Sequence, residues 1–172
     1  MRATVFLDRD GVINRRVGPG YVNVRDDFVL LPGVIQDMAW MSQRFRVVIV
    51  TNQQGIALGL TDPQLVRDLH AELADRVKRA GGHELEFFVC PHHRDSGCSC
   101  RKPRAGLLEQ ADQIEPVDWQ SSFLVGDSDR DIEAGKRKGV TTIKIGPTGE
   151  ADPDYTVASL QEARSLIERL SS

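Results

Sequence analysis

The sequence predicts an α/β fold, a three-layer sandwich in which a central parallel sheet is covered by helices on both faces. Short apolar segments alternate along the whole chain with amphipathic segments that carry helical periodicity. Polar and apolar residues do not alternate within the apolar segments, which is typical of strands buried on both faces of a sheet. The resulting β-α-β-α order favours parallel pairing of the strands.

Five apolar segments are predicted to be strands. The first is Ala-Thr-Val-Phe-Leu, and the second, Arg-Val-Val-Ile-Val-Thr, is rich in the β-branched residues that strands favour. The five segments cover residues 3–7, 46–51, 85–90, 122–125 and 141–145.

Helices are predicted between and after these strands. Apolar stripes at helical spacing lie within residues 34–45, 65–77, 107–111 and 163–170. Residues 129–138 complete the set, with acids in the first turn and bases in the last, as the helix dipole favours. Thr61 and Gln64 are expected to form a capping box at the start of the second helix. Ser159 and Glu162 are expected to cap the last one in the same way.

The composition is that of one globular domain, here residues 1–172. Of the 172 residues, 27% are charged and 40% hydrophobic, and the formal net charge is −3. This balance argues against disorder and against binding of nucleic acid through bulk charge. No apolar run is long enough for a membrane span, and Asp8 comes too early for a signal peptide. We expect a cytoplasmic protein without a membrane partner, and a monomer because no heptad stripe is present.

Two carboxylates follow the first predicted strand directly. Asp8 and Asp10 are two residues apart, so both side chains are expected on the same side of the chain. Two such close carboxylates repel each other and need a cation or a shared proton. The alternative is a surface turn, in which aspartate and glycine are common.

Polar residues also follow other predicted strands. Residues 51–54, Thr-Asn-Gln-Gln, offer a hydroxyl and side-chain amides that suit the oxygens of a phosphate. Lys102 could neutralise a phosphoryl group. Asp127, Asp129 and Asp131 are dense enough to predict a site for a hard cation such as Mg²⁺. Taken singly, each feature has a simpler alternative. Residues 51–54 could be a polar loop, Lys102 a solvated lysine, and one of the three acids a helix cap.

In this order, the four features resemble the haloacid dehalogenase (HAD) superfamily of phosphohydrolases, whose motifs run D-x-D-x-[TV], [ST], K and G-D-x-x-x-D. In this sequence the motifs correspond to residues 8–12, Thr51, Lys102 and residues 126–131. The resemblance covers nearly the whole chain and implies a Rossmann-like sheet. The gaps between the motifs leave no room for a separate cap domain.

The resemblance implies a phosphoryl transfer in two steps. Asp8 would be the nucleophile, and Asp10 the general acid and then the general base. Thr51 and Lys102 would hold the phosphoryl oxygens. The Mg²⁺ ligands that the resemblance implies are Asp8, the backbone carbonyl of Asp10, and Asp127. Asp131 would lie farther from the ion than these ligands.

A group of soft metal ligands lies in residues 90–100, here called the cysteine loop. The four candidate ligands are Cys90, His92, Cys98 and Cys100. Three thiolates and one imidazole complete a tetrahedral Zn²⁺ shell, and a shell without an open position is structural. His93 is an alternative to His92, and three free cysteines are the alternative to a site. The zinc would fix a loop with little apolar content and so place Arg101 and Lys102.

The cysteine loop and the following C-R-K-P, residues 100–103, resemble the histidinol-phosphatase branch of the superfamily, which includes heptose 1,7-bisphosphate phosphatases. Gly-Tyr-Val at residues 20–22 and Thr-Asn-Gln-x-Gly-Ile at 51–56 are more similar to the heptose enzymes. This implies removal of the 7-phosphate from a sugar bisphosphate, a step towards nucleotide-activated heptose. The substrate-binding residues expected are Gly20, Tyr21, Asn52, Gln53, Gln54 and Arg101.

Three departures from the heptose pattern leave the sugar and its anomer open. Gln54 stands where serine is common, residues 57–59 lack an arginine, and residues 15–19 are slightly longer than usual. Histidinol phosphate is the alternative substrate, but its amine would favour an acidic patch, and residues 15–20 are basic. Arginine suits a second phosphate better because it binds phosphate bidentately.

Two other classes of protein remain as alternatives. A receiver domain is also α/β and places acids, a threonine and a lysine around Mg²⁺, but it has no cysteine loop and would not turn over phosphate esters. A zinc-binding interaction module would be indifferent to the replacement of Asp8 by Asn.

Overall fold

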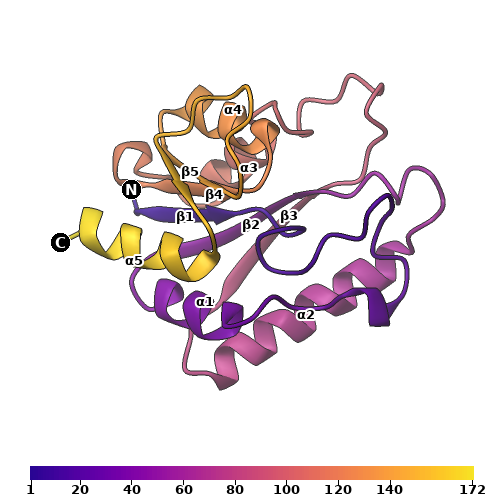
Figure 1. Ribbon diagram of the computed structural model, residues 1–172. Coiled ribbons are helices and arrows are strands. Elements are labelled where there is room, and N and C mark those ends of the chain that lie inside the picture. Colours follow the sequence, from indigo (N-terminus) through magenta and orange to yellow (C-terminus); the bar gives the residue numbers. More distant parts are fainter.

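The computed structural model describes residues 1–172, and it contains one six-stranded sheet (Figure 1). The strands are β1 (Thr4–Leu7), β2 (Arg46–Asn52), β3 (Leu85–Cys90), β4 (Phe123–Gly126), β5 (Thr141–Ile145) and β6 (Tyr155–Val157). Their order in the sheet is β3-β2-β1-β4-β5-β6, and every pair is parallel. The predicted α/β class is confirmed.

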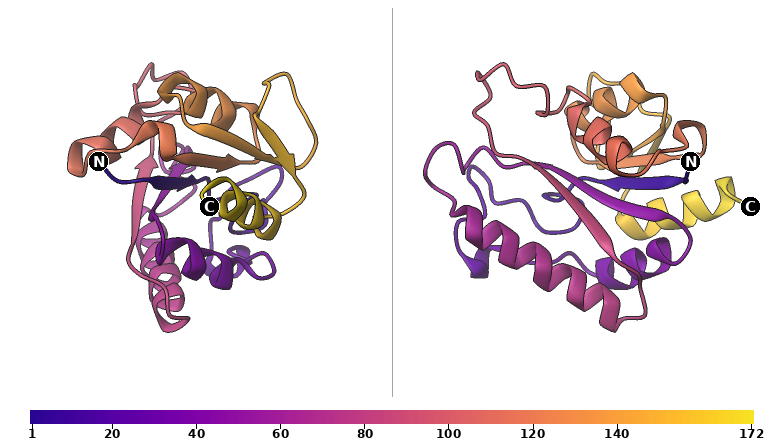
Figure 2. Two further views of the ribbon diagram at one scale, coloured as in Figure 1. Left: turned by 90° about the vertical axis from the view of Figure 1, so that its left-hand side faces the viewer. Right: turned by 180° about the vertical axis from the view of Figure 1, so that it is seen from behind.

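Helices cover both faces of the sheet. They are α1 (Val34–Ser42), α2 (Pro63–Arg79), α3 (Gly106–Ile114), α4 (Asp129–Lys138) and α5 (Leu160–Leu170). Helices α1, α2 and α5 lie on one face, and α3 and α4 lie on the other (Figure 2). Short 3₁₀ helices cover residues 25–27 and 119–121. No helix has the length and apolar character needed to pass through a membrane.

The apolar strands supply two cores, one on each face of the sheet. In β1, Val5 and Leu7 are buried with residues of α1 and α5, whereas Phe6 is buried on the opposite face with residues of α3. Successive side chains of a strand point to opposite faces, so an uninterrupted apolar run fills both cores. Each fully buried side chain of this size stabilises the fold by about 1.5–3 kcal/mol.

The sequence analysis missed β6. This strand has three residues, lies at the edge of the sheet and is mostly exposed, so it lacks the apolar run that marks the other strands. Its neighbour β5 carries that run, and β6 is defined by its pairing with β5 alone.

The predicted capping box at the start of α2 is wrong. Asp62 is the cap, and its carboxylate accepts a hydrogen bond from the backbone N–H of Gln64 at 2.8 Å. The hydroxyl of Thr61 donates to Asn23 instead, at 2.7 Å, and so ties two loops together. In α5 the predicted cap is confirmed, since Ser159 accepts from the backbone N–H of Glu162.

Because the strands are parallel, their carboxyl ends lie at one edge of the sheet. The loops that follow β1, β2 and β3 all emerge at this edge, on the right of Figure 1. Ligands of open α/β sheets bind at this edge.

Candidate active site

A cavity of about 290 Å³ opens at the carboxyl ends of the central strands. Most residues singled out in the sequence line it: Asp8, Asp10, Gly20, Tyr21, Asn52, Gln53, Gln54, Arg101 and Lys102. Thr51 and Asp127 are not part of the lining. The fold therefore brings together polar residues from four separate segments of the chain.

Asp8 and Lys102 form a buried ion pair at the base of the cavity. The backbone N–H of Asp8 donates to Val125, which continues the pairing of β1 with β4 and fixes the start of the loop. Lys102 Nζ donates to Asp8 Oδ1 at 2.8 Å and to the carbonyl of Val50 at 2.7 Å. Burial lowers the pKa of Lys102, but the charges of Asp131 and Asp8 outweigh it and leave that pKa raised. The ammonium therefore stays charged at neutral pH.

Three carboxylates meet beside this lysine. Oxygen atoms of Asp8, Asp127 and Asp131 lie within 4.8 Å of one another. Burial, and next the charge of Asp131, raise the pKa of Asp8 to about 7, although Lys102 acts in the opposite direction. Lys102 and Arg16, which pairs with Asp127, together leave one of the three negative charges unbalanced, and carboxylate oxygens are the donors that Mg²⁺ prefers. The donor set therefore fits a magnesium ion.

The structure places Asp131 beside Asp8 and Asp127. Its Oδ2 accepts hydrogen bonds from the backbone N–H and the hydroxyl of Ser128, which closes the first turn of α4. Its Oδ1 is buried and forms an ion pair with Lys102 Nζ at 2.6 Å. Asp131 thus joins the start of α4 to the base of the cavity.

Two glycines permit this close approach. A Cβ on Gly11 would lie 1.9 Å from Asp127 Oδ2, and one on Gly126 would lie 2.2 Å from the Cβ of Asp131. Gly11 also has a positive φ of 94°, which side-chain-bearing residues rarely adopt. The glycine in each acidic motif is therefore needed to bring the carboxylates together.

Asp10 is held by three donors. Its carboxylate accepts hydrogen bonds from Arg9 Nη2 at 3.0 Å, Asn14 Nδ2 at 2.8 Å and Gln53 Nε2 at 2.8 Å. Burial raises the pKa of Asp10, but the charge of Arg9 and these hydrogen bonds outweigh it and leave the pKa lowered. Asp8 and Asp10 therefore have opposite pKa shifts, because burial dominates at Asp8 whereas Arg9 and the hydrogen bonds outweigh burial at Asp10.

Arg9 is itself held by aromatic groups that were not singled out from the sequence. Its side chain is 1% exposed, and its guanidinium lies over the ring of Phe28. Arg9 Nη1 lies 3.4 Å from Nε2 of His70, whose ring stacks on Phe87. Burial, with a contribution from Arg9, lowers the pKa of His70 to about 3. The neutral imidazole can therefore accept the hydrogen bond from Arg9.

The segment after β2 forms one wall of the cavity. Thr51 is buried, and its Oγ1 accepts a hydrogen bond from Gln53 Nε2 at 2.8 Å. Asn52 exchanges two hydrogen bonds of 3.1 Å with the backbone of Lys102. These bonds tie the end of β2 to the segment that carries the lysine.

Gln54 joins three loops at the mouth of the cavity. Its Nε2 donates to the hydroxyl of Tyr21 at 3.1 Å, and its Oε1 accepts from the backbone N–H of Arg94 at 2.8 Å. A serine would be too short to make both contacts. The long side chain at this position therefore links the first loop to the cysteine loop.

Arginine side chains line the mouth of the cavity. They are Arg16, Arg94, Arg101 and Arg130. Of these four, only Arg101 was assigned to the substrate from the sequence. Arg94 and Arg130 gave no signal in the sequence, because one lies among metal-ligand candidates and the other among acids. Four guanidinium groups beside one cavity suit a ligand with more than one phosphate.

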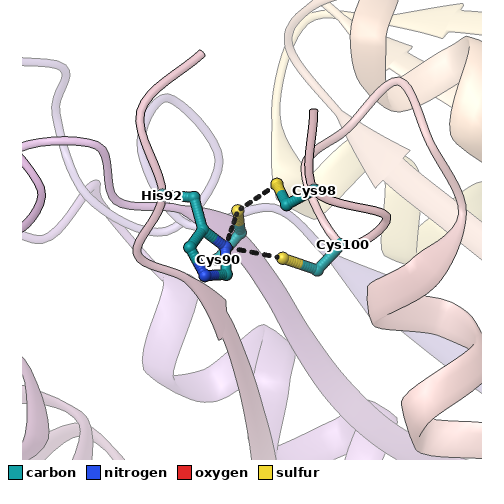
Figure 3. A group of neighbouring side chains, drawn as sticks. All are labelled: Cys90, His92, Cys98 and Cys100. Carbon is teal, nitrogen blue, oxygen red and sulfur yellow. Dashed lines mark hydrogen bonds between the residues drawn. The ribbon is translucent and has the colours of Figure 1, made fainter. Parts of the chain in front are cut away.

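The cysteine loop forms a second candidate metal centre (Figure 3). Cys90 Sγ lies 3.6 Å from His92 Nδ1 and 3.7 Å from Cys98 Sγ, and His92 Nδ1 lies 3.2 Å from Cys100 Sγ. His93 is outside this group, and its ring accepts a hydrogen bond from the backbone of Asp95. Three sulfurs and one nitrogen within 4.8 Å of one another could hold a zinc ion.

Comparison with known proteins finds one family. A model of HAD-hydrolase-like proteins matches residues 99–163. A D-glycero-β-D-manno-heptose-1,7-bisphosphate 7-phosphatase of Pseudomonas aeruginosa is 39% identical over 136 residues, 78% of this chain and 76% of the relative. A D-glycero-α-D-manno-heptose-1,7-bisphosphate 7-phosphatase of Photorhabdus laumondii is 35% identical over 159 residues, 88% and 86% of the two chains.

A solved structure shares the fold over almost its whole length. The crystal structure of D,D-heptose 1,7-bisphosphate phosphatase from Bordetella bronchiseptica, complexed with magnesium and phosphate, superposes with a TM-score of 0.87. It is 29% identical in sequence, and the match covers 98% of this chain and 99% of that one.

Proposed function

The chain belongs to the HAD-like phosphatases, the family of its heptose-bisphosphate relatives, and we propose that it removes the 7-phosphate from a D-glycero-D-manno-heptose 1,7-bisphosphate. The observation that supports this most directly is the buried contact between Lys102 and Asp8 beside Asp127 and Asp131. It provides a carboxylate nucleophile, a fixed cation and ligands for a divalent ion in one place.

In the first step a carboxylate oxygen of Asp8 attacks the phosphorus atom at position 7. The bond between phosphorus and the sugar oxygen breaks, and Asp10 donates a proton to that oxygen. The phosphate of the bound substrate favours the protonated form of Asp10, because a nearby negative charge raises the pKa of a carboxyl. Lys102 and Thr51 hold the phosphoryl oxygens.

In the second step a water molecule attacks the phosphorus atom of the aspartyl-phosphate. Asp10, now ionised, takes a proton from this water, and the bond between Asp8 and phosphorus breaks. Arg9, Asn14 and Gln53 hold the Asp10 carboxylate in one orientation through both steps. Inorganic phosphate leaves, and Asp8 is restored.

A magnesium ion would offset the repulsion between the Asp8 carboxylate and the phosphate of the substrate. The groups that would hold this ion are Asp8, Asp127 and the backbone carbonyl of Asp10, with Asp131 beside them. The buried Oδ1 of Asp131 pairs with Lys102 Nζ at 2.6 Å and would hold the ammonium group beside the ion.

Substrate choice depends on the mouth of the cavity. Gly20, Tyr21 and residues 52–54 would contact the sugar, and Arg101 would bind the phosphate at position 1. The basic rim favours a bisphosphate over histidinol phosphate, whose amine it would repel. The relatives include enzymes for both anomers, and the anomer used by this chain is left to experiment.

We also propose that residues 1–172 act as one domain, in the cytoplasm and as a monomer. Zinc in the cysteine loop would have a mechanical role. The loop ends two residues before Lys102, and a Cβ on Gly106 would lie 2.4 Å from the carbonyl of Ser99, so the loop packs tightly against the start of α3.

The test is a comparison of kcat/KM across a panel of phosphate esters. The panel includes both anomers of heptose 1,7-bisphosphate, heptose 7-phosphate and histidinol phosphate. We expect one heptose bisphosphate to be turned over at least tenfold more efficiently than the other compounds. Faster turnover of histidinol phosphate would contradict the substrate, and no turnover of any ester would contradict the phosphatase chemistry.

A further inference from the structure

Arg16 makes a contact that the proposed mechanism does not use. Its Nε donates to Asp127 Oδ2 and its Nη2 to Asp127 Oδ1, both at 2.7 Å. This is a bidentate pair, the strongest geometry for a guanidinium and a carboxylate. Asp127 is one of the carboxylates that would hold magnesium, so a fixed positive charge already lies on that ligand.

All three carboxylates of the cluster act electrostatically on the guanidinium of Arg16. The hydrogen bonds to Asp127 are the main cause of its raised pKa, and the charges of Asp8 and Asp131 add to it, although burial acts against them. A guanidinium there neutralises the same negative charge that a divalent cation would neutralise. Two cations at one carboxylate repel each other, so the pair and a bound ion oppose one another.

Arg16 lies at the surface, outside the regular elements of the fold. Its side chain is 51% exposed, whereas that of Asp127 is 15% exposed. It lies in the segment of residues 15–19, which forms no helix or strand. Release of Arg16 from Asp127 therefore breaks no secondary structure.

We propose that Arg16 is an internal counter-cation of Asp127 which magnesium displaces, and that the displaced guanidinium then binds the second phosphate of the substrate. Arg16 lines the same cavity as Arg94, Arg101 and Arg130, so its guanidinium needs only a local side-chain movement to join them. Magnesium binding and recognition of a bisphosphate are then linked through one residue. This inference rests on the proposed function, because it requires Asp127 to bind the ion.

The test is a calorimetric titration of substrate-free protein with Mg²⁺ alone. Arg16→Gln removes the competitor, and we expect it to bind Mg²⁺ about three- to fivefold more tightly than the unmodified chain. Arg15→Gln is the matched control, because Arg15 is exposed, makes no side-chain contact and does not line the cavity. It should leave Mg²⁺ affinity within about twofold. Unchanged or weaker binding by Arg16→Gln would overturn the proposal.

A kinetic comparison at saturating Mg²⁺ tests the second half. Arg16→Gln should lower kcat/KM for heptose 1,7-bisphosphate about tenfold more than it lowers kcat/KM for heptose 7-phosphate. An equal loss on both substrates would contradict a contact with the second phosphate.

The variant Asp127→Asn separates this inference from the proposed function. We expect Asp127→Asn to lose Mg²⁺ binding in the same titration. If it binds Mg²⁺ as tightly as the unmodified chain, the metal assignment fails and the inference fails with it. If Asp127→Asn loses the ion but Arg16→Gln gains no affinity, only the inference is overturned.

Discussion

The carboxylate cluster and the cysteine loop are both candidate metal centres, but they are assembled in different ways. Asp8, Asp127 and Asp131 come from opposite ends of the chain and meet because β1 and β4 are neighbours in the sheet. The four ligands of the cysteine loop lie within residues 90–100, between β3 and α3.

This difference teaches what each centre depends on. The carboxylate cluster has a scaffold of buried strands and keeps its geometry even though its charges repel. Apart from Cys90, the last residue of β3, the cysteine loop has no strand or helix of its own, so we expect its geometry to depend on a bound metal. Replacing a carboxylate of the cluster should therefore abolish turnover without unfolding the protein. Replacing a thiolate should first disorder the cysteine loop.

The largest effect is expected for Asp8→Asn. It should lower kcat by at least about 10⁴-fold, because an amide cannot act as the nucleophile. The raised pKa of Asp8, about 7, means that the native state binds more protons than the unfolded state between about pH 4 and 7, so this group destabilises the fold as pH rises. The melting temperature of Asp8→Asn at pH 8 should therefore equal or exceed that of the unmodified chain.

Asp129→Asn is the matched control for this prediction. Asp129 is an acid of the same helix start as Asp131, but its side chain pairs with Lys144 and does not line the cavity. Its activity should stay within about twofold of the unmodified chain. Turnover that survives in Asp8→Asn, or a fold that is lost with it, would break the contrast between the two centres.

A smaller effect on activity is expected for Cys98→Ser. The variant should lose bound zinc, become sensitive to proteolysis within residues 90–105, and show kcat/KM reduced by about 10- to 100-fold, because the loop no longer places Lys102. Elemental analysis, limited proteolysis and kinetics measure these three changes.

His93→Ala is the control for the cysteine loop, since His93 lies outside the group of four ligands. It should retain zinc and activity. Zinc that is absent from the unmodified chain, together with full activity, would refute a structural metal in this loop. Loss of zinc in His93→Ala but not in His92→Ala would reverse the assignment of the histidine.

The smallest effect on activity is expected for His70→Phe, which tests the packing beneath the carboxylate cluster. Because burial lowers the pKa of His70 to about 3, the unfolded state takes up a proton below about pH 6.5 and the native state does not. The free energy of unfolding should therefore fall as pH decreases from 6.5. The contribution of His70 to this fall should be about 2–3 kcal/mol at pH 4.5. Denaturant unfolding at the two pH values measures it.

His70→Phe should lose this component of the pH dependence while keeping the stack on Phe87. His83→Phe is the control, because His83 is exposed. The free energy of unfolding of this variant should depend on pH in the same way as that of the unmodified chain. If the unfolding free energies of His70→Phe and the unmodified chain fall in parallel, the buried histidine does not cause the acid sensitivity.

Much of the fold was predictable because its signals are local. The strands β1, β2 and β4 carry continuous apolar runs, and α4 has its acids, bases and final glycine in order. Features with weak local signals were not predicted correctly. Strand β6 is held by its pairing with β5, and the hydroxyl of Thr61 donates a hydrogen bond to Asn23 in a distant loop and does not cap its own helix. In each case a contact between remote segments decided the outcome.

By itself, the sequence determined the alternation of strands and helices, the acids that follow β1 and β4, and a compact set of candidate zinc ligands, since each depends on residues close together in the chain. Only the tertiary structure decided that Asp131 lies beside Asp8 and that Arg16 covers Asp127. It also placed the buried pair of Arg9 and His70 behind Asp10. These contacts join segments far apart in sequence, and their distances follow from how the sheet and its loops pack.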